Sequence, residues 1–184
     1  MYIFTFNEYS GGREESRRLL ARAMEAYQEI ADLRPRRSSE ELVASLEYTE
    51  KGKPFVPGWH HFSISHSENT WTVLFDEKEC GIDVQYEKDV DMDKVAGRVF
   101  APEDAEAAKA SQETFFQLWA RREAALKAAG LSVFDRIPSV QSMEVAIDGE
   151  TWQVFDAELL GTEDGCHAAV CTDHIPLEIH YYGL

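Results

Sequence analysis

The sequence predicts a mixed α+β fold with predominantly antiparallel sheets. Short strand-like runs bounded by turn residues alternate with capped segments of helical periodicity. A coarse repetition of a helix followed by strands occurs in each half of the chain. The 184 residues, 44% of them hydrophobic, suffice for one domain or for two small lobes that share a core.

The first half of the chain alternates strands and helices. Residues 13–31 predict an amphipathic helix, because apolar side chains recur at spacings of three and four. A serine cap precedes a helical segment at 41–46, and the Gly/Pro-rich segment 51–59 predicts a loop. Four runs predict strands: residues 2–6, 61–65, 71–75 and 81–85. The turn residues HSENT join 61–65 to 71–75 as a hairpin.

The second half contains the clearest helix of the sequence. Pro102 predicts a helix start, with Glu103 and Asp104 in the first turn. The clearest helix follows, capped by Ser111 and ended by Gly130. Four further strand-like runs complete the chain: residues 143–147, 151–157, 166–172 and 177–183.

The chain is strongly acidic. Its formal net charge is −16, from 18 Lys+Arg and 34 Asp+Glu. This balance argues against nucleic-acid binding, because phosphate backbones need a basic surface, and it disfavours an anionic membrane. No run reaches the length of a membrane-spanning helix. A phosphate-bearing ligand must therefore be held by a local basic cluster or a metal ion.

Cysteine usage indicates a reducing compartment. Cys80, Cys166 and Cys171 are odd in number and lack CxxC spacing, so we expect reduced thiols in a cytoplasmic protein. The N-terminal run MYIFTFNEYSGG has no basic segment and no long apolar core, so we expect no secretory signal.

Two carboxylates are predicted at positions that face the interior. Asp83 stands between Ile82 and Val84 in a buried strand, where a carboxylate needs a partner. Glu123 lies four residues before Lys127, on or beside the apolar helix face. Read alone, Glu123 and Lys127 are an ordinary helix ion pair. Together, Asp83 and Glu123 suit Mg²⁺, which completes its shell with phosphate and water.

Lys127 and His66 are candidate phosphate contacts. Lys127 would reach a phosphate as a point charge one helical turn beyond Glu123. His66 stands between two serines at a predicted strand end. A lone histidine is more often structural, but the flanking hydroxyls suit a phosphate.

Four segments, taken in order, resemble the Sfp-type 4′-phosphopantetheinyl transferase family. They are GKP (52–54), FSISHS (62–67), GIDVQ (81–85) and WARREAALK (119–127). The family pattern reads G-K-P, F-N-[IVL]-S-H-S, G-[IV]-D-[IV]-E and [FW]-x-x-K-E-[AS]-x-x-K. The order and spacing agree from residue 52 to residue 127.

The resemblance implies an enzyme of the holo-[acyl-carrier-protein] synthase type. Such an enzyme transfers the 4′-phosphopantetheine of coenzyme A to a serine of an apo acyl or peptidyl carrier protein, with Mg²⁺, and releases 3′,5′-ADP. The resemblance also implies two similar α/β lobes related by a pseudo-twofold axis, which we place at residues 1–88 and 89–184. Because two lobes in one chain complete the site, we expect a monomer.

The resemblance also assigns site residues by position. Asp83 and Glu123 would bind Mg²⁺ against the pyrophosphate, and Glu123 would serve as base for the carrier serine. Lys127 would contact the pyrophosphate and offset charge in the transition state. Ser65 and His66 would hold coenzyme A, His66 chiefly at the 3′-phosphate, while Lys53 would line the adenine side.

The sequence departs from the family pattern at the metal site and at the N-terminus. Gln85 stands where many members have a metal-binding Glu; its amide oxygen can still ligate Mg²⁺, so we expect weaker metal affinity. The basic segment that usually precedes the first helix is short. Arg17, Arg18 or Arg13 would then grip the 3′-phosphate, which would give an anionic ligand its local basic cluster.

Two alternatives from other classes stay open. One is a non-catalytic relative that binds carrier proteins or coenzyme A, favoured by Gln85 and the short N-terminus. The other is an unrelated Mg²⁺-dependent phosphohydrolase, which would leave the GKP and SHS runs unexplained. The sequence does not identify the carrier, for which we expect a docking patch around Val99, Phe100 and Phe115.

Overall fold

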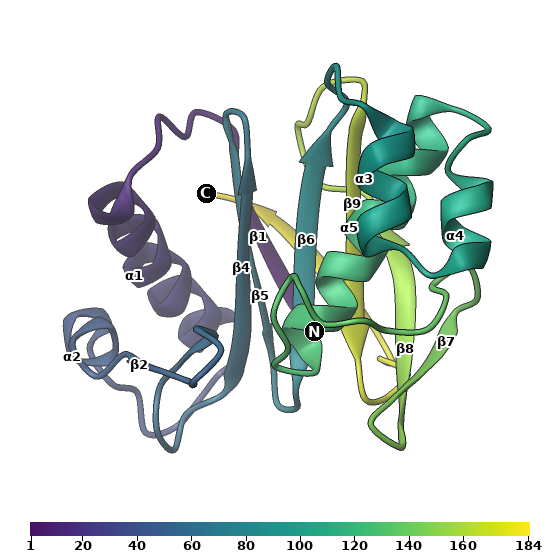
Figure 1. Cartoon of the computed structure of the whole chain (residues 1–184). Helices are drawn as coiled ribbons and strands as arrows, with labels where there is room; N and C mark the ends of the chain where they lie inside the picture. Colours follow the sequence, from purple (N-terminus) through teal and green to yellow (C-terminus); the bar gives the residue numbers. More distant parts are fainter.

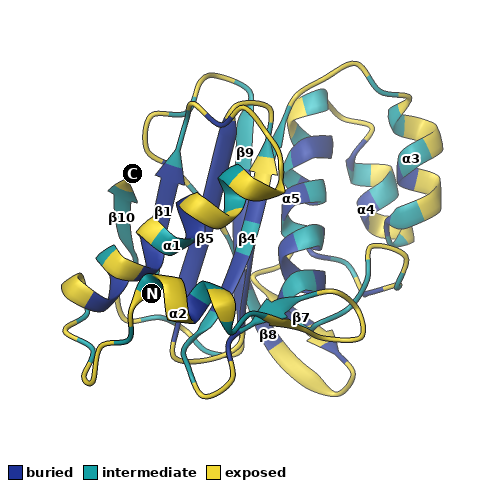
Figure 2. Ribbon diagram, turned by 90° about the vertical axis from the view of Figure 1, so that its left-hand side faces the viewer, coloured by how far each residue is buried: buried dark blue, intermediate teal, exposed yellow.

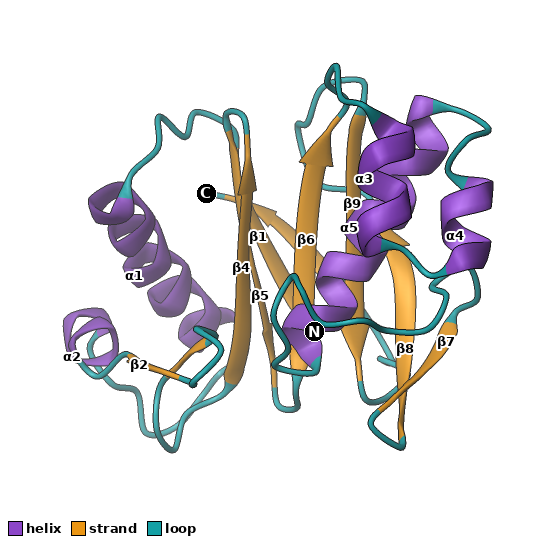
Figure 3. Ribbon diagram, viewed as in Figure 1, coloured by secondary structure: helices purple, strands orange, loops and turns teal.

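The computed structural model describes residues 1–184 as two four-stranded sheets with helices on their outer sides (Figure 1, Figure 3). Helices α1 (Arg13–Ile30) and α2 (Ser39–Ala44) lie on the side of the first sheet. Helices α3 (Met92–Val99), α4 (Pro102–Ala107) and α5 (Gln112–Ala128) lie on the side of the second. The predicted mixed α+β class is confirmed.

Both sheets are dominated by antiparallel pairs. The first sheet contains, in order, β10 (His180–Gly183), β1 (Tyr2–Phe6), β5 (Thr70–Asp76) and β4 (His61–Ser67). The second contains β6 (Cys80–Tyr86), β9 (Cys166–Thr172), β8 (Glu150–Ala157) and β7 (Glu144–Ile147). Only β1 and β10 pair in parallel. A small antiparallel ribbon joins β2 (Glu47–Tyr48) to β3 (Pro54–Phe55); β3 lies inside the segment 51–59 that the sequence predicts as a loop, and β2 lies just before it.

Helix caps and tight turns encoded in the local sequence determine where several of these elements begin and end. Ser38 caps α2 in a capping box with Glu41, and the Ser111 side chain caps α5 by accepting from the backbone NH of Thr114. The hairpin of β4 and β5 turns through two residues, and Glu68 has the positive φ of 50° that such a tight turn requires. Helix α3 is an addition to the predicted elements; the Asp91 side chain caps it by accepting from the NH of Lys94.

The chain exchanges strands between the two sheets. Strand β6 lies before residue 88 but pairs with β9 in the second sheet. Strand β10, at the other end of the chain, returns to pair with β1 in the first sheet. The division at residue 88 stays a prediction, and each sheet takes strands from both sides of it.

Three apolar clusters fill the spaces between these layers, and Figure 2 shows the buried first sheet behind the exposed outer face of α1. Between α1 and the first sheet, the largest buried side chains are Trp71, Tyr27, Phe4, Phe62 and Phe75. Between the sheets lie Ile3, Leu74, Ile82 and Val170. Between α5 and the second sheet lie Phe115, Ala124, Val154 and Ala169. Burial of these side chains is the main stabilising term.

Strands β4 and β6 lie side by side where the two sheets meet, yet they form no backbone ladder (Figure 1). Instead, serine hydroxyls on β4 accept hydrogen bonds from backbone NH groups on β6. The pairs are Ser63 with Ile82 (3.1 Å), Ser65 with Val84 (3.3 Å) and Ser67 with Tyr86 (3.2 Å). We call this contact the serine seam. It satisfies β6 amides that would otherwise be buried without partners.

No helix of the structure has the length and apolar character needed to cross a bilayer. All three cysteines are free thiols, as the sequence predicts.

Gly81 is the point where α5 comes closest to β6, and its substitution tests this packing. A Cβ at residue 81 would lie 2.0 Å from the Ala124 carbonyl oxygen and 2.5 Å from the Ala128 nitrogen. Because both atoms are backbone, α5 would have to move. We expect Gly81→Ala to lower the free energy of unfolding by about 3 kcal/mol in urea denaturation.

Gly97 provides the matched control, because a Cβ there meets no atom within 4 Å. In helix α3, Gly97→Ala should leave stability equal or raise it by up to about 1 kcal/mol. Equal stability of Gly81→Ala and wild type would contradict the close approach of α5 to β6.

Candidate active site

Asp83 is the centre of the candidate site. It lies in the middle of β6 and is 3% exposed. Its Oδ1 accepts from Ser65 Oγ and from Lys127 Nζ, each at 2.7 Å, and its Oδ2 accepts from Gln85 Nε2 at 2.8 Å. The predicted burial is confirmed, and the partner that a buried carboxylate needs is Lys127.

Lys127 joins the two sheets. Besides Asp83, its Nζ donates to the Ile64 carbonyl on β4 at 3.2 Å and to the Ile82 carbonyl on β6 at 3.1 Å. All three hydrogens of the ammonium group therefore have acceptors. The amine therefore links β4 to β6 at the serine seam, on the side that faces α5.

Glu123 lies one turn before Lys127 on α5, with a side chain that is 13% exposed. Its Oε1 accepts from Arg122 Nη1 at 3.1 Å. Burial raises the pKa of Glu123 above its ordinary value, and the nearby charge of Asp83 raises it further, against the opposing effects of Lys127 and Arg122. Asp83 and Glu123 therefore form a coupled acidic pair.

Small residues bring this pair together. Ala124 and Ala128 on α5 are at most 2% exposed, and their backbone lies against Gly81 on β6. Larger side chains at these positions would hold α5 away from the sheet. Glu123 and Lys127 would then lose their positions beside Asp83.

Arg122 anchors the surroundings of Glu123. Its guanidinium is buried, which lowers the pKa of Arg122. Its Nε donates to the Val99 carbonyl at 2.8 Å, and its Nη2 donates to the carbonyls of Val133 and Asp135 at 3.0 and 2.9 Å. A lysine could not direct donors over this span. Arg122 stands where the resembled family pattern has a lysine before the glutamate, and it keeps the positive charge while making these additional hydrogen bonds.

Gln85 contacts Asp83 through its amide nitrogen. This donor fixes Asp83 Oδ2 but brings no negative charge. The predicted role of Gln85 as a metal ligand would use the other amide atom, Oε1, and stays a prediction.

The acidic pair fits a magnesium ion that takes further ligands from its substrate. No group of three or more His, Cys, Asp and Glu side chains has metal-binding geometry. However, Mg²⁺ commonly uses one or two protein carboxylates and completes its shell with phosphate and water. Asp83 and Glu123 supply two carboxylates, and Asp83 Oδ2 accepts only one hydrogen bond from the protein. When bound, Mg²⁺ would polarise a phosphate group.

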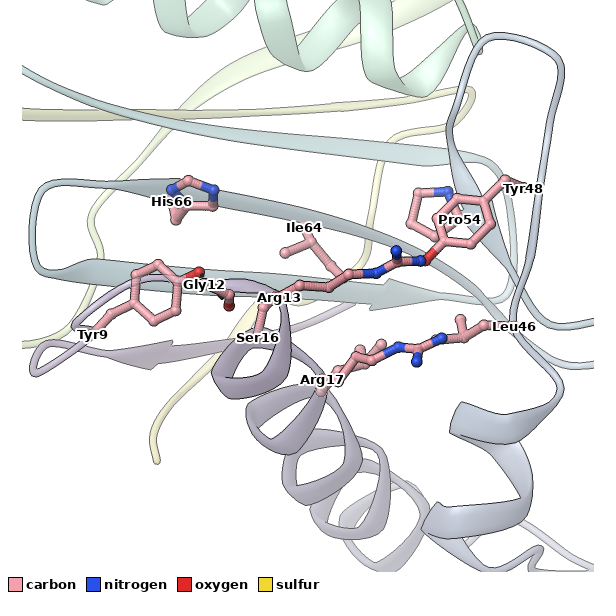
Figure 4. A pocket seen from close by; sticks show the side chains of 11 residues that line it. Tyr9, Gly12, Arg13, Ser16, Arg17, Leu46, Tyr48, Pro54, Ile64 and His66 are labelled. Atoms are coloured by element: carbon pink, nitrogen blue, oxygen red, sulfur yellow. Dashed lines mark hydrogen bonds between the residues drawn. The ribbon is translucent and has the colours of Figure 1, made fainter.

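A pocket of about 390 Å³ lies between β4 and the start of α1 (Figure 4). The side chains of Arg13, Arg17 and His66 line it, together with Tyr9 and Tyr48. Neither arginine takes part in an ion pair, and the rings of Tyr9 and His66 lie 5.2 Å apart. The pocket is therefore a cationic site on an acidic protein.

Strand β4 links this pocket to the acidic pair. Ile64 and His66 line the pocket, while Ser65, between them, donates to Asp83. Neighbouring side chains of a strand point to opposite faces of the sheet, so β4 lines the pocket on one face and contacts Asp83 on the other.

Two of the predicted contacts with coenzyme A lie elsewhere. Arg18 points away from the pocket and pairs with Glu15 at 3.3 Å. Lys53 donates to Glu79 at 2.5 Å and to the Ala128 carbonyl at the end of α5 at 3.2 Å. Lys53 thus complements the negative end of the α5 dipole.

The sequence analysis missed Tyr9, Tyr48 and Gly81 as contributors to the site. Tyr9 and Tyr48 precede and follow α1 in regions without periodicity, so no local signal marks them. Gly81 had a usable signal, because a glycine inside a strand often marks close backbone approach.

An acidic pair beside a cationic pocket suits a protein that handles a phosphate-bearing ligand. The model of one family, described as the 4′-phosphopantetheinyl transferase superfamily, matches residues 79–178, which is more than half of the chain. The chain belongs to this superfamily.

Curated relatives agree with this assignment. The chain is 28% identical over 146 residues to the 4′-phosphopantetheinyl transferase HetI of Nostoc sp., covering 68% of this chain and 59% of HetI. It is 32% identical over 95 residues to the 4′-phosphopantetheinyl transferase gsp of Aneurinibacillus migulanus, covering 49% and 40%. It is 31% identical over 96 residues to the 4′-phosphopantetheinyl transferase psf-1 of Bacillus pumilus, covering 48% and 40%. The matches thus span between 40% and 59% of the length of these relatives.

The raised pKa of Glu123 predicts a pH-dependent effect of its substitution in the metal-free protein. Because the pKa is higher in the folded state, ionisation of Glu123 destabilises the fold above the ordinary pKa of 4.5. Glu123→Gln should therefore raise the melting temperature by a few degrees at neutral pH. The gain should shrink as the pH falls through the pKa of the folded state and vanish below 4.5, where Glu123 is protonated in both states.

Thermal unfolding followed by circular dichroism, with chelator present, measures this effect. Glu25→Gln, at an exposed glutamate of α1, is the control and should change little at any pH. A Glu123→Gln protein that is less stable than wild type at neutral pH would contradict the coupling of Glu123 to Asp83.

Proposed function

We propose that the protein transfers the 4′-phosphopantetheine group of coenzyme A to a serine of an apo acyl or peptidyl carrier protein, with Mg²⁺, releasing 3′,5′-ADP. One observation carries the proposal: the coupled carboxylates Asp83 and Glu123 lie beside Lys127, one strand from a cationic pocket. Membership of the superfamily and the names of the relatives support the same reaction.

The two phosphate-bearing parts of coenzyme A would bind at two different places. The pyrophosphate of coenzyme A would lie near Lys127 and a magnesium ion held by Asp83 and Glu123. The 3′-phosphate would enter the pocket of Arg13, Arg17 and His66, whose arginines have no carboxylate partner. We propose Arg13 for this role ahead of Arg18.

We also propose that Lys53 lies on the adenine side of coenzyme A, although its amine is already hydrogen-bonded within the protein. Its amine already binds Glu79 and the Ala128 carbonyl. A contact with adenine would use the aliphatic stem of Lys53 and leave these two hydrogen bonds in place.

In the proposed reaction, the carrier serine oxygen attacks the phosphorus that bears pantetheine. The bond from this phosphorus to the bridging oxygen breaks, and 3′,5′-ADP leaves. Glu123 takes the serine proton, directly or through a water. Lys127 offsets the negative charge that develops on the phosphate oxygens.

We also propose that the protein acts as a monomer in the cytoplasm and binds no nucleic acid. Both sheets come from one chain, and the candidate site lies where they meet. The free thiols suit a reducing compartment, and the net charge of −16 repels polyanions.

Intact-mass spectrometry of apo carrier proteins tests the transfer. After incubation with coenzyme A, Mg²⁺ and this protein, we expect a carrier to gain the mass of one phosphopantetheine. Asp83→Ala and Glu123→Ala should lower the rate by at least about 100-fold, because each removes a group required by the charged transition state.

The other outcomes favour the alternatives. Binding of coenzyme A without transfer to any carrier would favour the non-catalytic relative, in which Gln85 leaves the site one charge short. Mg²⁺-dependent cleavage of coenzyme A without a carrier would favour a phosphohydrolase.

Arginine substitutions test the site of the 3′-phosphate. Arg13→Ala and Arg17→Ala should each weaken coenzyme A binding about tenfold in calorimetry, because a charged hydrogen bond is worth about 1.5–3 kcal/mol. Binding of dephospho-coenzyme A, which lacks the 3′-phosphate, should not change. Arg18→Ala is the matched control on the same helix and should bind like wild type. If Arg13→Ala or Arg17→Ala weakened binding of coenzyme A and dephospho-coenzyme A equally, the 3′-phosphate would not bind at these arginines.

A further inference from the structure

An exposed apolar segment follows α5. Phe134 is 90% exposed and Val133 is 47% exposed, and Arg136 and Pro138 are exposed beside them. Adjacent exposed apolar side chains next to a candidate site suggest contact with another protein. We call Val133, Phe134, Arg136 and Pro138 the 133–138 surface.

The backbone that carries Phe134 is held from both sides. Arg122 Nη2 binds the carbonyls of Val133 and Asp135, the two neighbours of Phe134. Lys51, in the ribbon before β4, pairs with Asp135 at 3.2 Å. Phe134 is therefore displayed on a fixed segment, and an anchor that is already ordered loses little entropy on binding.

The same guanidinium connects this segment to the candidate base. Arg122 Nη1 donates to Glu123 Oε1 at 3.1 Å while its Nη2 holds the segment. A partner that binds the 133–138 surface would therefore sit next to Glu123.

The 133–138 surface continues into a small pocket that has Arg136 in its lining and begins one residue after Arg98. The pocket, of about 290 Å³, is lined by Val99, Ile137, Pro138 and Arg136 among others, with Glu103 as its acidic member. Arg136 and Arg98 are exposed and form no ion pair. On a protein with a net charge of −16, these two unpaired arginines are a local attraction for acidic side chains of a partner.

Two residues expected at the docking patch are unsuitable. Phe100 is 8% exposed and Phe115 is 1% exposed, and both belong to the core beneath α5. Sequence alone could not separate them from Phe134, because all three are phenylalanines near the long helix. The exposed aromatic side chain in this region is Phe134.

We infer that the 133–138 surface docks the apo carrier protein, through apolar and acidic side chains that lie near its acceptor serine. This inference rests on the proposed function. Phe134 is the apolar anchor, and Arg136 with Arg98 pairs with the acidic side chains; aromatic and arginine residues commonly dominate interface energies. The position beside Glu123 delivers the serine to the base.

Steady-state kinetics with a carrier that the wild-type protein modifies test the inference. Phe134→Ala should raise the KM for the carrier about tenfold, which corresponds to the loss of one interface anchor. The kcat and the KM for coenzyme A should stay unchanged. Arg136→Ala should raise the carrier KM a few-fold, more at low ionic strength than at high.

Leu177→Ala is the matched control, because Leu177 is fully exposed and lines a separate pocket. It should leave the carrier KM unchanged. An unchanged carrier KM in Phe134→Ala would overturn the docking surface while the proposed function stands. Absence of transfer by the wild-type protein on all carriers would overturn the proposed function, and the docking inference with it.

Discussion

The serine seam between β4 and β6 is the contact on which the rest of the structure depends. Both strands are sheet edges, and they exchange no backbone ladder bonds. Serine hydroxyls bind the β6 amides, and Lys127 binds a carbonyl from each strand. Ser65 and Lys127 also bind Asp83. The groups that join the two halves therefore also position the acidic pair, so the fold cannot form its interface without forming the site.

Much of the fold follows from local signals in the sequence. Caps, hydrophobic periodicity and turn residues predict α1, α5 and the hairpin of β4 and β5, and the structure confirms these elements. Local signals cannot predict that β6 pairs with β9 or that β10 joins β1, because these pairings depend on residues far apart in the chain. Helix α3 escaped prediction because it starts inside the acidic run around Asp91.

The sequence likewise predicts part of the candidate site, while other parts are visible only in the structure. The need of Asp83 for a partner shows in the sequence, and the structure brings Asp83, Ser65 and Lys127 into one hydrogen-bonded group. The arginine assignment needed the structure, because Arg13 and Arg18 differ only in the direction that each leaves α1. The same holds for the anchoring role of Arg122 and for the exposure of Phe134.

In the proposed function, Asp83 and Glu123 act as one acidic site for a coenzyme A–magnesium complex. Calorimetry of coenzyme A binding with and without Mg²⁺ tests it most directly. We expect Mg²⁺ to strengthen binding to the wild-type protein, and we expect this gain to disappear in both Asp83→Asn and Glu123→Gln. A Mg²⁺-dependent gain that persists in either variant would contradict it.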